Sequence, residues 1–382
     1  MKHKANSILL TFVGAHIVND FYVTVLPAFL PALADEFGLD YTELGVLSFA
    51  FTLLSGVMQP AIGHHADRRG KRRAVVAFGF MMGAAGFVSM AASPNFWLIV
   101  AVSSLCGLGG ATYHPQATAF IVEAYPADRG RMLGIHGWGG SVGHFLAPAV
   151  VTLSIAAFDW RTSMVAIAVP LVLTSVLLRS TLEETVPNPA ARLKGALSVQ
   201  LLLVAGTFGL LSVVLRSFLT FSVKMLVDEG WENTSAGAAL TVILLVGAIA
   251  QPVGGRLFDR IGGRTVFVGA SVGTALSVGL FVLSSGALSL VAIGCIAFFG
   301  FALFPVSLAL ASQLAHSGQT GAAVGIIFGM SGLMSAAAQP VVGALGENFG
   351  SIRSALGSLI VVTVVAVPMA LNIDKGHVSV EL

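Results

Sequence analysis

Three polar side chains share one face of the first long apolar run of the chain. His16, Asn19 and Asp20 are spaced three and four residues apart, so a helix brings them together. An ionisable group inside an apolar span costs about 2.5–3.5 kcal/mol on insertion, so it normally faces protein or a water-filled cavity. A histidine beside a carboxylate can take up and release a proton near neutral pH. We predict that His16 and Asp20 carry protons and that Asn19 contacts a substrate. The alternative is structural, with a neutral His16 bonded to a carbonyl and Asp20 capping a broken helix.

Two later apolar runs also carry polar residues. Tyr113 and His114 precede Pro115, whose ring removes a backbone hydrogen bond and bends a helix. We expect both to bind substrate in a central cavity, although a packing kink in which His114 satisfies a freed carbonyl is an equally good interpretation. His136 and Trp138 lie in the glycine-rich stretch 134–143, where small residues permit close helix packing, and are further candidate substrate contacts.

One arginine lies deep inside the seventh apolar run. Arg216 cannot shed its charge, so it needs a carboxylate partner or an anionic substrate. We predict Asp20 as that partner and Arg216 as a substrate-binding residue. Lys224 lies nearer the outer end of the run and is expected to extend toward the lipid head groups.

Four intramembrane histidines raise the question of a metal site. These histidines lie in three different runs, and Asp20 is the only acidic residue that accompanies them: His16, His114, His136 and His144. A transition-metal cluster normally has closer ligand spacing and more Cys, Asp or Glu. We therefore predict no metal site and no cofactor.

The elements that position these residues must be membrane helices. Of 382 residues, 56% are apolar and 10% are charged, against about 25% charged in a soluble domain. The charge-free runs reach the roughly 20 residues that cross a bilayer core, without the alternation of a membrane β-barrel. The sequence predicts an all-α protein with twelve transmembrane helices. Their approximate bounds are 8–33, 43–65, 74–92, 96–123, 131–156, 162–180, 197–226, 234–257, 265–284, 287–313, 321–345 and 352–371.

Charge distribution predicts the orientation of these spans. With a cytoplasmic N-terminus, sixteen Lys and Arg residues fall on the cytoplasmic side and only Arg161 and Arg353 fall outside. This bias follows the positive-inside rule and predicts that both termini are cytoplasmic, in the inner membrane. The first run contains His16 and Asp20 instead of a clean apolar core, so we interpret it as a retained helix and not as a signal peptide. Cys106 and Cys295 both lie in apolar runs and form no disulfide framework.

The chain consists of two copies of one unit. Residues 59–73 recur in weaker form at 251–264, and the same shift of 192 residues carries Pro148 onto Pro340 and Arg161 onto Arg353. We predict an N-terminal six-helix bundle (1–181), a cytoplasmic linker (182–197) and a C-terminal six-helix bundle (198–382). Six spans per unit make the repeats parallel, an arrangement that surrounds a central cavity at the membrane midplane.

The repeated loop carries a family resemblance. The pattern Gly63-x-x-x-Asp67-Arg68-x-Gly70-Lys71-x-Arg73 resembles the signature loop of the major facilitator superfamily of secondary transporters. Residues 123–131, with Glu123, Pro126 and Arg129, resemble its companion at the end of span 4. The resemblance implies twelve helices around a central cavity and transport by alternating access.

A narrower resemblance rests on shorter motifs. Residues 15–20 and 26–31, together with Tyr113-His114-Pro115-Gln116, are similar to the fosmidomycin-resistance group of efflux proteins. This implies export of drugs or metabolites. Span 5 resembles the glycine-rich motif of antiporters in the superfamily, although the usual Gly-Pro step is missing.

The loop residues are candidates for gating. A carboxylate among cations at helix ends can form contacts that break when the cytoplasmic side opens, and a carboxylate adds nothing to positive-inside sorting. We predict gating roles for Gly63, Asp67, Arg68, Gly70, Lys71, Glu123, Arg129, Asp259 and Arg260. For His64, Arg69 and Arg72 we predict only a role in membrane topology.

These observations favour a transporter over an enzyme or a sensor. The chain has no Ser-His-Asp order, no metal-ligand spacing and no nucleotide loop of the form Gly-x-x-x-x-Gly-Lys-Ser/Thr. We predict a monomeric, proton-coupled exporter of a small anionic or amphipathic compound, with the lipid bilayer as its surroundings and no nucleic-acid partner. The alternative is proton-coupled uptake or exchange of an organic anion such as a carboxylate, anchored by Arg216.

Overall fold

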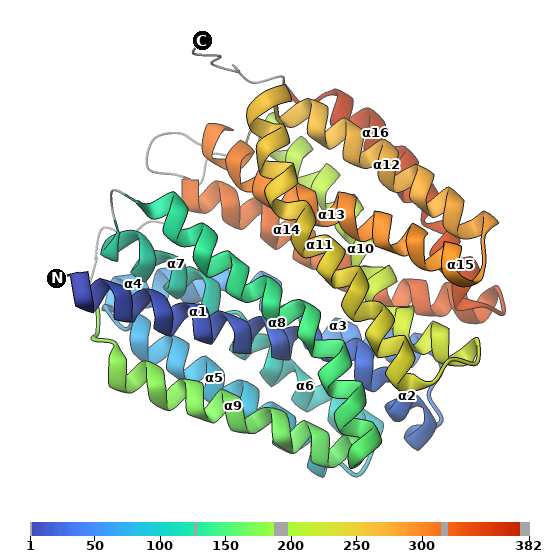
Figure 1. The fold of residues 1–382 in the computed structure, drawn as a ribbon, viewed down its shortest axis with the longest axis horizontal. Coiled ribbons are helices and arrows are strands. Elements are labelled where there is room, and N and C mark those ends of the chain that lie inside the picture. The colour runs from blue at the N-terminus through green and yellow to red at the C-terminus, as the bar shows by residue number, and fades with distance from the viewer. Residues whose placement is uncertain (1, 126–127, 187–197, 315–319, 375–382) are drawn as a thin grey trace. The chain divides into compact units, whose positions relative to one another are not determined.

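The computed structural model describes residues 2–125, 128–186, 198–314 and 320–374, and all regular structure in these ranges is helical (Figure 1). The helices of the N-terminal half are α1 (Lys2–Thr24), α2 (Leu26–Phe37), α3 (Tyr41–Val57), α4 (Gln59–Arg69), α5 (Arg72–Ala92), α6 (Phe96–Gly110), α7 (Tyr113–Ala124), α8 (Arg129–Ala157) and α9 (Trp160–Thr181). Those of the C-terminal half are α10 (Val199–Asp228), α11 (Asn233–Ile261), α12 (Gly263–Leu283), α13 (Gly286–Leu314), α14 (Thr320–Asn348), α15 (Ile352–Ser358) and α16 (Ile360–Leu371).

These helices form twelve spans long and apolar enough to cross a membrane. The predicted all-α, twelve-span architecture is confirmed, and the predicted edges agree to a few residues; span 7, for example, was placed at 197–226 and runs from Val199 to Asp228. A chain with this many apolar spans is a multi-pass membrane protein.

Four spans are broken into two helices each. Three of the breaks have a proline in the first turn of the second helix: Pro27 in α2, Pro60 in α4 and Pro115 in α7. Proline lacks the amide hydrogen that the preceding turn would need, but the first turn of a helix leaves that hydrogen unpaired anyway. The break predicted beside Pro115 therefore occurs, between Gly110 and Tyr113.

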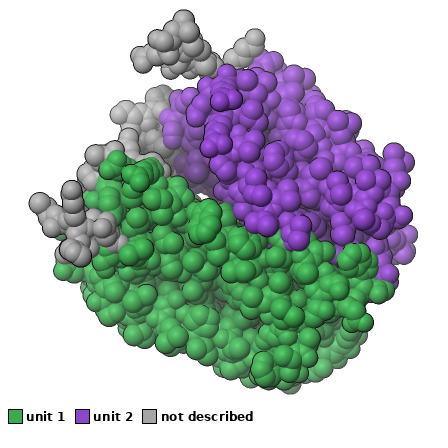
Figure 2. All heavy atoms as spheres, in the orientation of Figure 1, with its two compact units in different colours: residues 1–39, 46–193, 230–241 green, residues 40–45, 194–229, 242–382 purple. Residues whose placement is uncertain are grey.

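Contacts divide the chain into two compact units, shown in different colours in Figure 2. Unit 1 comprises residues 1–39, 46–193 and 230–241, and unit 2 comprises residues 40–45, 194–229 and 242–382. In unit 1, α1 packs along α8 while α5 packs against α6 and α9 (Figure 1). In unit 2, α10 packs along α14 while α12 packs against α13 and α16. The two units thus use corresponding helix pairs, as a sequence repeat requires.

The glycine-rich stretch of α8 allows this helix to approach α1 closely. A Cβ atom added at Gly139 would lie 2.8 Å from the carbonyl oxygen of Val13, and one added at Gly143 would collide with the carbonyl oxygen of Ile17. Small residues let two membrane helices bring their backbones together. The same approach carries the polar residues of α8 to those of α1.

Candidate functional site

The candidate site is built around Asp20, which is only 5% exposed within unit 1. Nε2 of His16 and Nδ1 of His144 each lie 3.1 Å from Oδ2 of Asp20. On the other side, Asn19 donates a hydrogen bond of 2.8 Å to Oδ1, and Nε2 of His114 lies 3.7 Å from the same atom. One carboxylate therefore faces three histidines from three helices, an arrangement that can hold a proton.

Three features of the chain place these groups together. The four-residue spacing on α1 puts His16 and Asp20 on one face, as predicted. The break before α7 sets His114 at the start of a helix that contacts α1. On α8, a Cβ atom at Gly140 would lie 2.5 Å from Nε2 of His16 and would collide with Oδ2 of Asp20, so only glycine leaves room for the carboxylate.

A second layer of hydrogen bonds surrounds His16. Its Nδ1 lies 2.7 Å from the carbonyl oxygen of His136, and the two imidazole rings stack with centroids 4.0 Å apart. Nε2 of His136 lies 3.0 Å from the hydroxyl of Tyr113, which donates a 2.6 Å hydrogen bond to the carbonyl oxygen of Phe12. The carbonyl contact of His16 is the one that the structural alternative predicted, whereas the contacts of Tyr113 with His136 and Phe12 were not anticipated.

The predicted substrate contacts divide into buried and accessible residues. Tyr113, His136 and Asn19 are 1%, 5% and 2% exposed, and their polar atoms contact other protein groups. Close packing of α1, α7 and α8 encloses Tyr113 and His136 in this structure, and their substrate contacts stay a prediction. His114 has a side chain that is 41% exposed, and Trp138 is 70% exposed on α8. His114 is thus the most exposed of the three histidines that face Asp20.

Arg216 lies on α10 in unit 2, at an exposed position among buried neighbours. Its predicted pairing with Asp20 joins two different units and stays a prediction. Lys224 pairs with Asp228 one turn further along α10, and its ammonium lies 5.6 Å from the centroid of the Tyr41 ring. Its side chain is thus engaged by protein groups of unit 2.

The histidines are not scattered, contrary to what their positions in the sequence suggested. Ligand-type atoms of His16, Asp20 and His114 all lie within 4.8 Å of one another, close enough for one ion to reach all three. Helix packing, which sequence spacing does not report, accounts for the difference. The prediction of no metal therefore has to be tested by experiment.

The predicted gating loop contains an ion-pair network, but one of its members was missed. Nε of Arg72 lies 2.7 Å from Oδ1 of Asp67, and Nη1 of Arg72 contacts Oε1 of Glu123. Arg72 thus links the end of α4 to the end of α7, so the prediction of a purely topological role for Arg72 is wrong. The arginine side chain is largely buried, and an unpaired buried charge would be unfavourable.

The other predicted gating residues lie around this network. Gly70 has φ of 62°, the left-handed conformation that ends α4, and Gly63 approaches the ring of Pro115 on α7. Arg68 and Lys71 enter no ion pair with any residue in the described ranges. The side chain of Arg129 is outside the described set. Asp259 and Arg260 are exposed on α11, and the shift of 192 residues carries Glu123 onto Ala315, which has no carboxylate.

Glu184, in the segment that follows α9, was not predicted as a functional residue. Its two carboxylate oxygens accept hydrogen bonds of 3.1 and 3.0 Å from the backbone N–H groups of Arg73 and Ala74, in the first turn of α5. Nη1 of Arg73 in turn donates a 3.1 Å hydrogen bond to the carbonyl oxygen of Leu182. The segment that leaves α9 is therefore fixed to the gating loop. Its place near the start of the predicted linker 182–197 was the only available signal.

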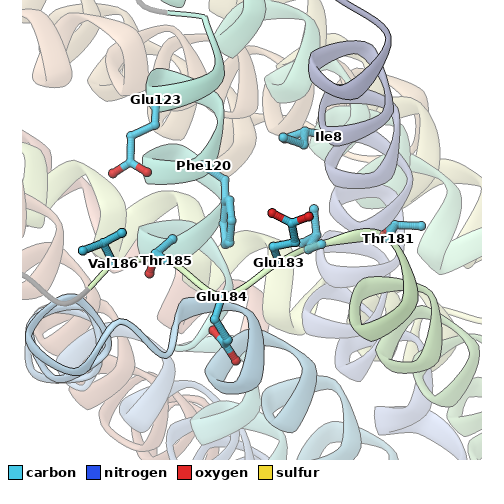
Figure 3. A pocket seen from close by; sticks show the side chains of 9 residues that line it. Ile8, Phe120, Glu123, Thr181, Glu183, Glu184, Thr185 and Val186 are labelled. Carbon is cyan, nitrogen blue, oxygen red and sulfur yellow. The ribbon is translucent and has the colours of Figure 1, made fainter. Parts of the chain in front are cut away.

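A cavity of about 440 Å³ lies beside this attachment, between the start of α1, the end of α7 and residues 181–186 (Figure 3). Ile8 and Phe120 form apolar walls, while Glu123 and Glu183 contribute carboxylates. Figure 3 shows the carboxylate of Glu184 directed away from Glu123. The attachment by Glu184 thus forms one edge of the cavity.

Two six-span repeats with a buried carboxylate and histidine cluster in the first of them define a secondary-transporter architecture. The chain belongs to the Major Facilitator Superfamily, which it matches over residues 12–334 and again over residues 197–377. It is 27% identical over 362 residues to the uncharacterized MFS-type transporter YfnC of Bacillus subtilis (strain 168), covering 88% of this chain and 87% of that one. It is 24% identical over 355 residues to the fosmidomycin resistance protein of Escherichia coli (strain K12), covering 87% and 85% of the two chains.

Solved structures resemble the fold. A bacterial homolog of the human lysosomal transporter Spinster, in an inward-facing and unoccupied conformation, superposes with a TM-score of 0.81 at 14% identity, covering 97% of each chain. The nucleoside transporter NupG (D323A mutant) superposes with a TM-score of 0.80 at 12% identity, covering 96% of this chain and 100% of that one. Both likenesses concern the fold alone.

Proposed function

We propose that this protein exports a small anionic or amphipathic compound across the inner membrane in exchange for protons, by alternating access. The observation that carries the proposal is the buried Asp20, which faces His16, His114 and His144 inside the membrane-spanning part of unit 1. A carboxylate in such a position is a functional candidate by default. The transporter class comes from the family, whereas the coupling ion, the substrate and the direction are the proposal.

Proton coupling follows from the chemistry of the cluster. Both Oδ2 of Asp20 and Nε2 of His16 can accept a proton, and their 3.1 Å separation lets one proton serve both. With the proton bound, the pair is either an imidazolium beside a carboxylate or a neutral imidazole beside a carboxylic acid. Without that proton, the carboxylate of Asp20 faces the lone pair on Nε2 of His16. Substrate arriving beside His114 can favour one of these states, and that preference would link substrate and proton fluxes.

The substrate class rests on charge. Arg216 carries a permanent cation on α10 at an exposed position, and His114 is the accessible member of the cluster. A permanent cation such as that of Arg216 favours compounds that carry a carboxylate or phosphonate. The export direction is supported by the similarity to the fosmidomycin resistance protein. Cytoplasmic termini are supported by the bias of Lys and Arg.

The proposal is tested with purified protein in proteoliposomes that contain a pH-sensitive dye. Candidate phosphonates, carboxylates and lipophilic drugs are added to wild type, to Asp20→Asn and to Asp159→Asn. Asp159 is a matched control because it also accepts hydrogen bonds, yet it caps the outer end of α9. We expect substrate-driven proton movement in wild type and in Asp159→Asn, and none in Asp20→Asn.

Two results would contradict the proposal. Substrate flux without proton movement in wild type would rule out proton exchange, and an undiminished proton signal in Asp20→Asn would remove Asp20 from the pathway. A parallel series with a chelator and with added Zn²⁺ tests the metal alternative raised by the 4.8 Å cluster. Substrate flux that requires Zn²⁺ would show that the metal ion, and not the proton, is the coupling ion.

The alternative function is proton-coupled uptake or exchange of an organic anion anchored by Arg216. Right-side-out and inverted vesicles distinguish the two directions. In either case Arg216→Gln should abolish transport of anionic substrates, because glutamine keeps hydrogen-bond donors but removes the charge. Transport of a carboxylate unaffected by Arg216→Gln would leave the substrate without its proposed anchor.

A further inference from the structure

We propose that Tyr113 is a positioning residue that acts through His136 to confine the exchangeable proton to Nε2 of His16 and Asp20. The inference rests on the proposed function, because it describes the same proton site. It differs from the sequence expectation, which placed Tyr113 and His136 in contact with substrate.

First, Tyr113 determines which ring nitrogen of His136 carries the hydrogen. The hydroxyl of Tyr113 has one hydrogen, which it donates to the carbonyl oxygen of Phe12 at 2.6 Å. The same hydroxyl lies 3.0 Å from Nε2 of His136, so in that contact the tyrosine oxygen must accept and Nε2 must carry the hydrogen. Tyr113 therefore selects the Nε2–H form of His136.

The second step fixes the proton on His16. A backbone carbonyl only accepts, so Nδ1 of His16, 2.7 Å from the carbonyl oxygen of His136, must be the donor. Nε2 of His16 is then the nitrogen that gains or loses a proton, and it faces Oδ2 of Asp20 at 3.1 Å. The carbonyl oxygen of His136 thus leaves one exchange position on His16, and Tyr113 acts on it by holding His136 in place.

The third step keeps the proton off His136. The rings of His16 and His136 stack at 4.0 Å and 20°, so two imidazolium charges there would repel strongly at low dielectric. The Tyr113 ring lies beside both imidazoles, with centroid distances of 5.2 Å to His16 and 5.9 Å to His136, and its hydroxyl contact holds the His136 ring in place. The other ionisable groups facing the cluster are His114 on α7, whose ring centroid lies 5.2 Å from that of His16, and His144 on α8, and both contact Asp20.

Histidine ¹⁵N NMR of the full-length protein in lipid nanodiscs tests this inference without any transport. The signal of His136 is assigned by its disappearance in His136→Gln. We expect wild-type His136 in the Nε2–H form. In Tyr113→Phe the Nε2–H preference should fall by about fivefold, the effect of one ordinary hydrogen bond on an equilibrium. Tyr22→Phe is the matched control, because Tyr22 is a buried tyrosine of unit 1 whose hydroxyl contacts the carbonyl oxygen of Cys106 at 3.4 Å.

The spectra can also overturn the inference. Wild-type His136 in the Nδ1–H form would do so, as would an unchanged His136 signal in Tyr113→Phe. If Tyr113→Phe fails to fold, the wild-type spectrum alone decides. The protein could show the expected tautomers and yet move no protons. That result would contradict the proposed function but would leave this assignment of hydrogens intact.

A transport measurement gives the functional consequence. Tyr113→Phe should lower the ratio of protons to substrate, because the His136 ring beside His16 is then no longer held in one tautomer and one orientation. His136→Gln keeps an N–H donor but cannot be protonated, so Tyr113→Phe should add no further loss in that background. Additive losses in the double variant would show that Tyr113 acts by another route.

Discussion

Gly140 lies directly against the carboxylate of Asp20, with no room between them for a side chain. A Cβ atom at this position would collide with Oδ2 of Asp20 and would lie 2.5 Å from Nε2 of His16. The site therefore depends on a residue that has no functional group. A helix residue selected for the space it leaves is invisible to any search for chemically active side chains.

Substitution of Gly140 by alanine tests this relationship. We expect Gly140→Ala to abolish substrate-driven proton movement and to destabilise the protein by about 1–3 kcal/mol, the usual effect of overpacking. Gly137→Ala is the control, because a Cβ atom there meets nothing within 4 Å and alanine favours a helix. Thermal unfolding in detergent measures stability, and the dye assay measures proton movement. Equal behaviour of the two variants would contradict the steric argument.

The ion-pair network at the loop between α4 and α5 gives a second prediction. Arg72→Gln leaves Asp67 and Glu123 without their shared cation and should lower the free energy of unfolding by about 1–3 kcal/mol. Arg68→Gln, in the same loop but outside the network, should change it by less than about 0.5 kcal/mol. Denaturant titration of the two variants checks the difference. An equal loss in both would return Arg72 to a purely topological role.

The attachment of Glu184 to α5 gives a third prediction. Glu184→Ala removes both acceptors from the first turn of α5, and loss of a cap typically costs about 1 kcal/mol. Hydrogen exchange should accelerate at the amides of Arg73 and Ala74. Glu184→Gln keeps one acceptor and should give an intermediate rate. Unchanged exchange in Glu184→Ala would mean that the contact does not stabilise the helix start.

Much of the architecture could be predicted from the sequence, because membrane spans depend on local composition. Apolar runs of bilayer length gave twelve spans, and the proline at 115 gave the break in span 4. The face shared by His16, Asn19 and Asp20 followed from helix periodicity alone. These features need no knowledge of which helix packs on which.

The rest depends on tertiary contacts that no local pattern reports. The convergence of His114 and His144 on Asp20 requires α7 and α8 to pack on α1, and the enclosure of Tyr113 follows from the same packing. Arg72 looked like one more cation in a basic loop, because its partners lie 5 and 51 residues away. Charge type was visible in the sequence, whereas pairing was not.

The N-terminal end of α9 gives a prediction for pH dependence. Hydrogen bonds from the hydroxyl and the backbone N–H of Thr162 lower the pKa of Asp159 below its usual value. A carboxyl with a lowered folded pKa stabilises the protein above the unfolded pKa of about 3.9, and that contribution is lost as the pH falls through the folded pKa. Protection of the Thr162 amide should therefore fall in acid. Asp159→Asn should remove this pH dependence while keeping the cap, and a persistent dependence would point to another group.

Arg161 and Arg353 make equivalent contacts in the two units. Arg161 donates to the carbonyl oxygens of Ala91 and Ser93 at the end of α5 and pairs with Glu36. Arg353, 192 residues later, donates to the carbonyl oxygens of Phe281 and Ser284 at the end of α12 and pairs with Glu229. Each guanidinium thus joins two spans of its own unit through a helix C-terminus and a carboxylate.

This equivalence predicts similar losses in the two units. Lysine keeps the charge but cannot reach two carbonyls and a carboxylate at once, so Arg161→Lys and Arg353→Lys should each lower the free energy of unfolding by about 1–3 kcal/mol. Arg179→Lys, on an exposed arginine in the last turn of α9, should have almost no effect. Denaturant unfolding in detergent, repeated for the double variant, measures the losses. Because the contacts lie in separate units, the two losses should add, and strong non-additivity would mean that the arginines share a partner.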